Sequence, residues 1–237
     1  MSFLMLKSCI TMFALALSLT CLSTQPAMAE THFETRMAAI KKDVGALPSS
    51  TTSTIVMLGD SITEGFFTAG AMPEKILGLP VVDEGIGGDV IGTTTSTVGV
   101  VSRLEQVKQA KPAIVFVMIG INNLWDPKTP AESTIEKYEQ MVPLLKAAAP
   151  NAKLVFESVL PTTGKMNYVN PKVLQLNARI KELASKNGAA WLDLHSLMKN
   201  DKGELNPDFT KDGVHLKGPA FDVWLKALQE TASQILK

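Results

Sequence analysis

The sequence has no surplus of either charge and few aromatic residues. Lys and Arg together number 23, as do Asp and Glu, so the formal net charge is zero. Without a run of basic residues, neither a nucleic-acid partner nor binding to an anionic membrane surface is expected. Hydrophobic residues make up 46% of the chain and charged residues 19%. This composition excludes a disordered chain and fits a globular domain.

The first residues have the three parts of a secretory signal peptide. Lys7 supplies a positive charge, residues 10–22 are uncharged and mostly apolar, and residues 27–29 (AMA) form a small-residue cleavage site. The apolar stretch is shorter than the ~20 residues that a bilayer-spanning helix needs, which disfavours an uncleaved anchor. We expect residues 1–29 to be removed on export. Residues 30–237 should then form a single periplasmic or secreted domain without stable membrane insertion.

Cysteine is absent from the predicted mature chain, because Cys9 and Cys21 both lie in the signal segment. A cysteine nucleophile, a cysteine-based zinc site and a disulfide framework are therefore excluded. The glycine cluster at 85–88 continues with Val90 where a dinucleotide-binding loop has its last glycine, and no Gly-Lys-Ser/Thr phosphate loop occurs. A flavin is disfavoured because Asp60 would repel its phosphate. We expect neither a cofactor nor a metal ion.

Short apolar runs alternate with stretches of helical periodicity along the rest of the chain. The runs predict five strands, at 54–58, 80–83, 113–119, 153–159 and 189–194. Helical spacing of apolar residues predicts helices at 33–44, 130–149, 171–187 and 219–236, with Gly188 as the C-cap of the third. This alternation predicts a parallel sheet covered by helices on both faces.

Polar residues and glycines follow the predicted strands at their carboxyl ends. Ser61 comes after the first strand, Gly88 after the second and Asn122 after the third. Asp212 and His215 follow the fifth strand and its loop. Ligands of an open parallel sheet bind outside the carboxyl ends of the strands, so we expect these five residues to converge there.

These residue types suit acyl transfer. A serine hydroxyl is a weak nucleophile that needs a base, and the imidazole of His215 can provide it. Asp212, three residues earlier, can reach the Nδ1–H of that imidazole across a tight turn. The backbone N–H groups of Ser61 and Gly88 and the side-chain amide of Asn122 are candidate donors to the developing oxyanion.

Other residues near the strand ends are expected to have structural roles. His195, at the end of the fifth strand, is interpreted as a packed or hydrogen-bonded histidine rather than a base. Asp60 and Asp89 are expected to brace their loops. Three aromatic residues could line an acyl pocket, although plain packing is the commoner role of such residues: Phe66, Phe67 and Trp125.

Taken together, these segments resemble the SGNH hydrolases, also called GDSL-type esterases and lipases. The matching blocks are Ser61 in GDSIT, Gly88 in GIGGD, Asn122 in GINN, and Asp212 and His215 in DGVH. The resemblance implies a flavodoxin-like three-layer α/β/α sandwich with a five-stranded parallel sheet of order 2-1-3-4-5. It implies Ser61 as nucleophile, His215 as base and Asp212 as its partner, with Ser61, Gly88 and Asn122 forming the oxyanion hole.

The chain departs from the family pattern in three places. Ile62 stands where the family name has leucine, and Asn123 where aspartate is frequent. Asp83 and Glu84 precede the glycine cluster where an asparagine is common. None of these changes removes a catalytic group, although Asn123 could alter loop bracing or substrate contacts.

The expected function is that of an exported serine esterase that forms a covalent acyl-enzyme on Ser61. A compact chain without a lid insertion favours short acyl groups, such as O-acetyl esters of carbohydrates. Lysophospholipase or thioesterase activity on longer acyl chains is the alternative, and acyl transfer to a sugar would use the same residues. An alternative of another class is a non-catalytic carbohydrate-binding module on the same fold.

Overall fold

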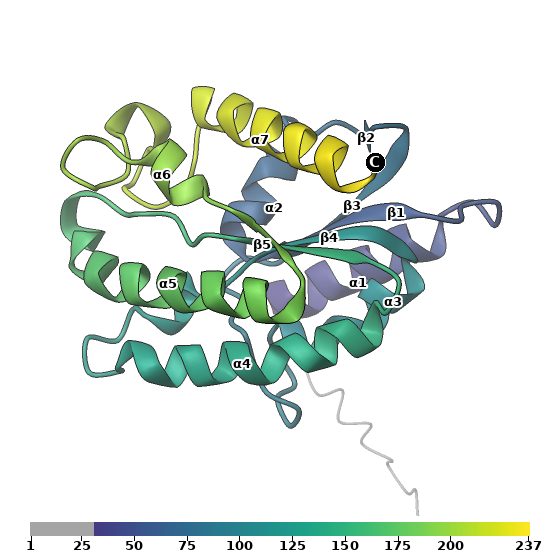
Figure 1. Cartoon of the computed structure of the whole chain (residues 1–237), viewed down its shortest axis with the longest axis horizontal. Helices are drawn as coiled ribbons and strands as arrows, with labels where there is room; N and C mark the ends of the chain where they lie inside the picture. The colour runs from purple at the N-terminus through teal and green to yellow at the C-terminus, as the bar shows by residue number, and fades with distance from the viewer. Residues whose placement is uncertain (1–30) are drawn as a thin grey trace, which may run out of the picture.

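A sheet of six strands runs through the middle of the protein in the computed structural model, which describes residues 31–237 (Figure 1). The predicted signal peptide lies outside the described residues. The strand order is β2-β3-β1-β4-β5-β6. The strands are β1 (Thr54–Gly59), β2 (Lys75–Ile76), β3 (Leu79–Gly85), β4 (Pro112–Met118), β5 (Lys153–Glu157) and β6 (Ala190–Leu192).

Five of these strands are parallel and have the order that the family resemblance implies, so the predicted fold class is confirmed. The sixth, β2, was not predicted. It pairs antiparallel with β3 at the edge of the sheet. A strand of two residues has no apolar run or alternation long enough to be recognised from the sequence.

Helices cover both faces of the sheet (Figure 1). One layer contains α1 (His32–Gly45), α3 (Leu104–Gln109), α4 (Ala131–Ala148) and α5 (Asn170–Asn187), and the other contains α2 (Ser61–Thr68) and α7 (Pro219–Ile235). Short 3₁₀ helices are η1 (Val100–Arg103), η2 (Ile121–Asn123), η3 (Gly164–Val169) and η4 (Pro207–Phe209). Gly188 ends α5 with φ 67°, as predicted for its C-cap. Among residues 31–237, no helix combines the length and apolar character needed to cross a bilayer.

The end of the fifth parallel strand differs from the prediction. β6 stops at Leu192, and a short helix, α6 (Leu194–Met198), follows it. Asp193 begins this helix, because its side chain accepts a hydrogen bond from the backbone N–H of Ser196. His195 therefore lies in a helix and not at the end of a strand.

The core of the α2–α7 layer contains an aromatic stack. Phe66 of α2 is completely buried, and its ring centroid lies 5.1 Å from that of Phe221 and 4.7 Å from that of Trp224 on α7. Packing of this kind joins the two helices. Phe66 is thus a core residue and does not line an acyl pocket, whereas Phe67 is partly buried against the same core.

One carboxyl group is buried in this layer. Successive side chains of β5 point to opposite faces: Phe156 packs edge-on against Tyr138 of α4, and Glu157 accepts a hydrogen bond of 2.7 Å from the indole of Trp224. Burial raises the pKa of Glu157 to about 8, although the hydrogen bond from Trp224 opposes this shift. Glu157 is therefore a neutral acid at pH 7.

The raised pKa of Glu157 makes stability depend on pH. The folded protein holds this proton more tightly than the unfolded chain, so the stabilisation is complete below about pH 4.5 and is lost as the pH rises through about 8. Glu157→Gln should match the wild type near pH 5 and exceed its unfolding free energy by about 1 kcal/mol or more at pH 9. Urea unfolding at the two pH values measures this. Exposed Glu136→Gln is the control, and an identical pH dependence of Glu157→Gln and wild type would contradict the assignment.

Candidate active site

Ser61 is the first residue of α2, two residues after β1 ends at Gly59. Asp60 caps this helix, because its carboxylate accepts a 3.0 Å hydrogen bond from the N–H of Ile62. Burial raises the pKa of Asp60 to about 7, and the bond from Ile62 opposes the shift. Asp60 thus braces its loop as predicted. As the first helical residue, Ser61 has a backbone N–H without an acceptor inside the helix.

Asp212, His215 and Ser61 form a continuous series of hydrogen bonds. Ser61 Oγ lies 3.0 Å from His215 Nε2, and His215 Nδ1 lies 2.7 Å from Asp212 Oδ2. The other carboxylate oxygen, Oδ1, accepts the backbone N–H groups of Val214 and His215 at 2.9 and 2.8 Å. Desolvation raises the pKa of Asp212, but the bonds from His215 and Val214 outweigh it and lower the pKa to about 2. Asp212 is therefore ionised at any pH at which imidazole can act as a base.

The turn between Asp212 and His215 requires glycine. Gly213 has φ 93°, and a Cβ there would lie 2.5 Å from the carbonyl oxygen of Thr163. The N–H of Thr163 in turn donates to the carbonyl of Gly213 at 2.9 Å. The loop before η3 thus packs directly against the turn that carries the histidine.

The site is open to solvent. The side chains of His215 and Asp212 are 51% and 53% exposed, and Ser61 is half-buried. The imidazole of His215 can therefore be reached directly from solvent.

Gly88 and Asn122 lie on neighbouring segments. Gly88 has φ 75°, a conformation that favours glycine. The side-chain Nδ2 of Asn122 donates to the carbonyl of Asp89 at 2.8 Å, and its Oδ1 accepts from the indole of Trp125 at 2.8 Å. An amide nitrogen has two N–H donors, so one remains available to a ligand. Trp125 thus fixes the orientation of Asn122, a role that the sequence analysis did not foresee.

Asn123 also holds the glycine loop, which is the segment 85–91 that includes Gly88. Its Oδ1 accepts the backbone N–H of Ile91 at 3.1 Å. An aspartate can make the same bond, so the departure from the family pattern at Asn123 preserves this contact with the loop.

Arg103 joins the segments beneath the site and was missed by the sequence analysis. It is completely buried in η1. Its guanidinium donates to Asp89 Oδ2 at 2.7 and 3.1 Å, to the carbonyl of Gly59 at 2.8 Å, and to the carbonyl of Glu84. The carboxylate of Glu84 lies 3.3 Å away, and burial raises its pKa to about 7 against the attraction of Arg103. Asp89 therefore braces its loop through a buried ion pair.

His195 has the structural role that was predicted. It is buried in α6, and its backbone N–H donates to the hydroxyl of Ser158 at 2.6 Å. Burial lowers the pKa of its ring, which favours the neutral form. The hydrogen bond to Ser61 comes from His215 instead.

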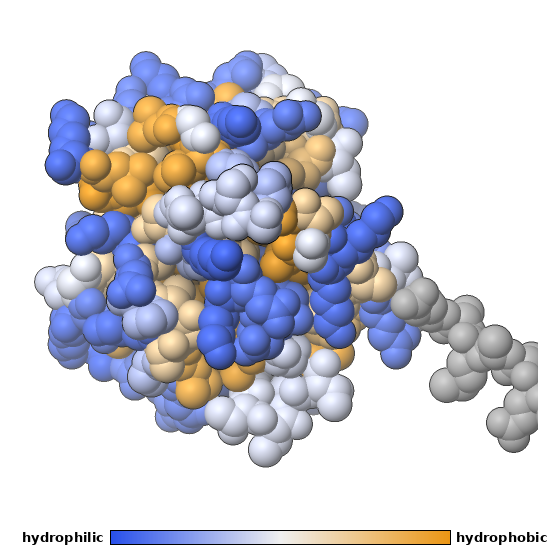
Figure 2. Space-filling view, turned by 90° about the vertical axis from the view of Figure 1, so that its right-hand side faces the viewer, coloured by the Kyte–Doolittle hydropathy of each residue, from blue (hydrophilic) through white to orange (hydrophobic). Residues whose placement is uncertain are grey.

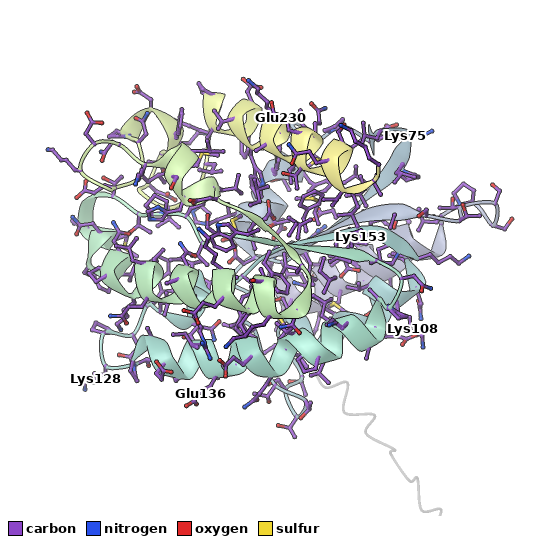
Figure 3. The ribbon with its side chains drawn as sticks, in the orientation of Figure 1. Lys75, Lys108, Lys128, Glu136, Lys153 and Glu230 are labelled. Atoms are coloured by element: carbon purple, nitrogen blue, oxygen red, sulfur yellow. The ribbon has the colours of Figure 1, made fainter. Side chains whose placement is uncertain are left out.

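A hollow of about 490 Å³ lies at the opposite, amino-terminal edge of the sheet. Its lining includes Lys108, Lys111 and Lys153. Figure 2 views this side of the molecule, where hydrophilic and hydrophobic residues are interspersed, and Figure 3 shows Lys108 and Lys153 on it. α3 and α4 both end at this edge, and lysines near helix carboxyl ends offset the helix dipole. Because the hollow lies at the edge opposite the carboxyl ends of the strands, it is not part of the Ser61 site.

The fold is that of an α/β protein with a serine, a histidine and an aspartate hydrogen-bonded in series at the carboxyl edge of its sheet. Residues 57–219 match the sequence profile described as the GDSL-like Lipase/Acylhydrolase family. The chain belongs to this family, which confirms the resemblance found from the sequence.

The chain is also similar to individual proteins. The chain is 26% identical over 186 residues to platelet-activating factor acetylhydrolase IB subunit alpha2 of Rattus norvegicus, covering 77% of each chain. A GDSL-like lipase from Bacteroides thetaiotaomicron aligns with a TM-score of 0.65 at 24% identity, over 84% of this chain and 97% of that one. A carbohydrate esterase family 3 structure from Talaromyces cellulolyticus aligns with a TM-score of 0.56 at 20% identity, over 77% and 97%. The two structures share the fold with this chain.

Removing Arg103 should destabilise the fold strongly. Arg103→Met leaves Asp89 and Glu84 buried without a counter-charge, and breaking a buried ion pair in this way costs about 3–5 kcal/mol. Urea unfolding at pH 7 measures the change. Arg179→Met is the matched control, because Arg179 also binds two carboxylates but lies near the surface. Its loss should cost about 1 kcal/mol or less, and equal losses for the two variants would contradict the role of Arg103.

Proposed function

We propose that this protein hydrolyses carboxylic esters through an acyl-enzyme on Ser61, without a metal ion or cofactor. The observation that carries the proposal is the series from Ser61 Oγ through the His215 ring to Asp212, with distances of 3.0 and 2.7 Å. Both ring nitrogens of His215 lie within hydrogen-bond distance of a partner, Nε2 near the Ser61 hydroxyl and Nδ1 near the Asp212 carboxylate. This is the arrangement that a serine nucleophile requires.

Each step uses groups already in place. Ser61 Oγ attacks the ester carbonyl while His215 Nε2 takes its proton, and ionised Asp212 stabilises the imidazolium that forms. The oxyanion accepts hydrogen bonds from the N–H groups of Ser61 and Gly88 and from the free N–H of Asn122. His215 then protonates the leaving alcohol. A water molecule, activated by the same imidazole, releases the acid and restores the serine.

Short acyl esters of carbohydrates are the substrates that we favour. The half-exposed imidazole leaves room for a bulky alcohol group. Tyr168 is 44% exposed, and its hydroxyl donates to the carbonyl of Trp125 at 2.8 Å. An aromatic side chain with an apolar face and a polar edge suits an amphipathic sugar ring. Two similar proteins, an acetylhydrolase and a carbohydrate esterase by name, support the same class of substrate.

Three alternatives predict different results. A lysophospholipase or thioesterase would prefer longer acyl chains, and an acyltransferase would pass the acyl group to a sugar hydroxyl. A non-catalytic carbohydrate-binding module would have no use for the hydrogen-bonded series at Ser61.

We also propose that residues 1–29 are a cleaved signal peptide and that residues 30–237 act as one periplasmic or secreted domain.

A chain-length series tests the proposal. Residues 30–237 are assayed with p-nitrophenyl acetate, butyrate, octanoate and palmitate, beside Ser61→Ala. We expect kcat/KM to be highest for acetate, and Ser61→Ala to lower kcat by about 10⁴-fold or more. A maximum at octanoate or palmitate would favour the lipid-directed alternative. Activity no higher than that of Ser61→Ala on every ester would contradict an ester hydrolase and favour the binding module.

A further inference from the structure

Three side chains from α1 and α2 meet on the outside of the glycine loop that contains Gly88. Glu64 lies on α2, three residues after Ser61, and His32 and Arg36 lie on the first turns of α1. His32 Nε2 is 3.0 Å from Glu64 Oε2, and Arg36 Nε is 3.3 Å from Glu64 Oε1. The Glu64 side chain is only 13% exposed, so the N-terminal helix covers it.

Glu64 binds the backbone of the loop directly. Its Oε2 accepts the N–H of Gly87 at 2.6 Å. The next N–H along the chain is that of Gly88, the proposed oxyanion donor. Holding the N–H of Gly87 fixes the peptide plane next to the one that carries the N–H of Gly88, and so limits the directions in which that N–H can point.

Arg36 fixes the beginning of the same loop. Its guanidinium donates to the carbonyl of Gly85 at 2.9 and 3.2 Å and to Asp83 Oδ2 at 2.8 Å. Asp83 Oδ1 in turn accepts the N–H of Gly85 at 2.7 Å. Both backbone polar groups of Gly85 are thus held by side chains, in addition to its pairing with Gly59.

Close contact around the loop is an independent observation. A Cβ on Gly87 would lie 2.9 Å from His32 Nε2 and 3.1 Å from Glu64 Oε2. A Cβ on Gly85 would lie 2.3 Å from the backbone nitrogen of Glu64. Glycine is required at Gly85, because the obstacle there is the backbone of α2, whereas at Gly87 the obstacles are the ends of the His32 and Glu64 side chains.

We propose that Glu64, held by Arg36 and His32, is a positioning residue that orients the Gly88 N–H for the oxyanion. The inference rests on the proposed ester hydrolysis at Ser61. Oxyanion donors act by being preorganised, and a misplacement of about 1 Å can cost about 10²-fold in rate. α1 thereby becomes part of the support of the proposed catalytic centre.

The kinetic test compares Glu64→Ala with Glu64→Gln, using p-nitrophenyl acetate. Glu64→Ala should lower kcat by about 10- to 100-fold with little change in KM, because the oxyanion forms only after the substrate binds. Glu64→Gln keeps an oxygen that accepts the Gly87 N–H and should recover most of kcat. Equal kcat for Glu64→Ala and wild type, or equal losses in both variants, would overturn the proposal.

Glu139→Ala is the matched control. It also removes a carboxylate from an arginine, since Glu139 lies 2.5 Å from Arg179, but it does so on α4. We expect its kcat to stay within about twofold of the wild type, as is usual for an exposed ion pair. A fall in kcat as large as that of Glu64→Ala would show that loss of any such pair has this effect, and would overturn the proposal.

Gly87→Ala provides a second route if Glu64→Ala does not fold. The added methyl group crowds the ends of the His32 and Glu64 side chains and should push Glu64 away from the N–H of residue 87, lowering kcat as Glu64→Ala does. Replacing His32 by Ala in the same chain removes the nearest obstacle and should restore part of the activity. Wild-type kcat in Gly87→Ala, combined with fast exchange of the N–H of residue 87, would overturn the proposal, because the Glu64 contact would then be lost without effect on the rate.

Amide hydrogen exchange separates this proposal from the proposed function. The Gly87 N–H should exchange slowly in wild type and Glu64→Gln, and at least 10-fold faster in Glu64→Ala. This readout remains valid even if the wild type hydrolyses none of the esters, in which case only the proposed function fails. Unchanged exchange at Gly87 in Glu64→Ala would overturn the positioning role.

Discussion

The buried guanidinium of Arg103 is the interaction on which the carboxyl edge of the sheet depends. An arginine without solvent contact needs partners for its donors and a counter-charge. Arg103 obtains both from the end of β1 at Gly59, from Glu84 on β3, and from Asp89 in the glycine loop. Its planar fork of N–H groups suits this task better than the single ammonium group of lysine. One side chain thereby sets the spacing between the segment that carries the serine and the loop that follows Gly88.

The glycine loop is held from two sides. Arg103 binds Asp89 from the interior, whereas Glu64 and Arg36 bind Gly87 and Gly85 from the outside. Asn122 adds a third contact through the carbonyl of Asp89, and the indole of Trp125 fixes the other end of its amide. Backbone donors fixed in this way need not reorganise when charge develops on a substrate oxygen, which is the condition for effective electrostatic stabilisation.

A rigid support beneath an open surface suits the proposed hydrolysis of esters that have a large alcohol group. The imidazole of His215 is half exposed, while Asp60, Asp89 and Arg103 below it are buried. The chemistry therefore depends on buried contacts that tolerate little change. The surrounding loops, by contrast, can vary without disturbing the buried contacts. Tyr168 is one such surface residue, and its hydroxyl donates to the carbonyl of Trp125.

By itself, the sequence determined the fold class and the order of the residues at the strand ends. Apolar runs such as TIVML (54–58) and AIVFVMI (113–119) are local signals of buried parallel strands, and the C-cap at Gly188 is a local signal as well. The placement of Ser61, Asp212 and His215 at one edge followed from topology, because parallel strands end at the same edge of a sheet.

Only the tertiary structure decided which side chains support that edge. Arg103 meets Gly59 from 44 residues away, and Arg36 meets Gly85 from 49 residues away. The core position of Phe66 was likewise settled by packing, through its contacts with Phe221 and Trp224 of α7. Contacts of this range leave no periodicity in the sequence, because each depends on where several distant segments place their backbones after the sheet has formed.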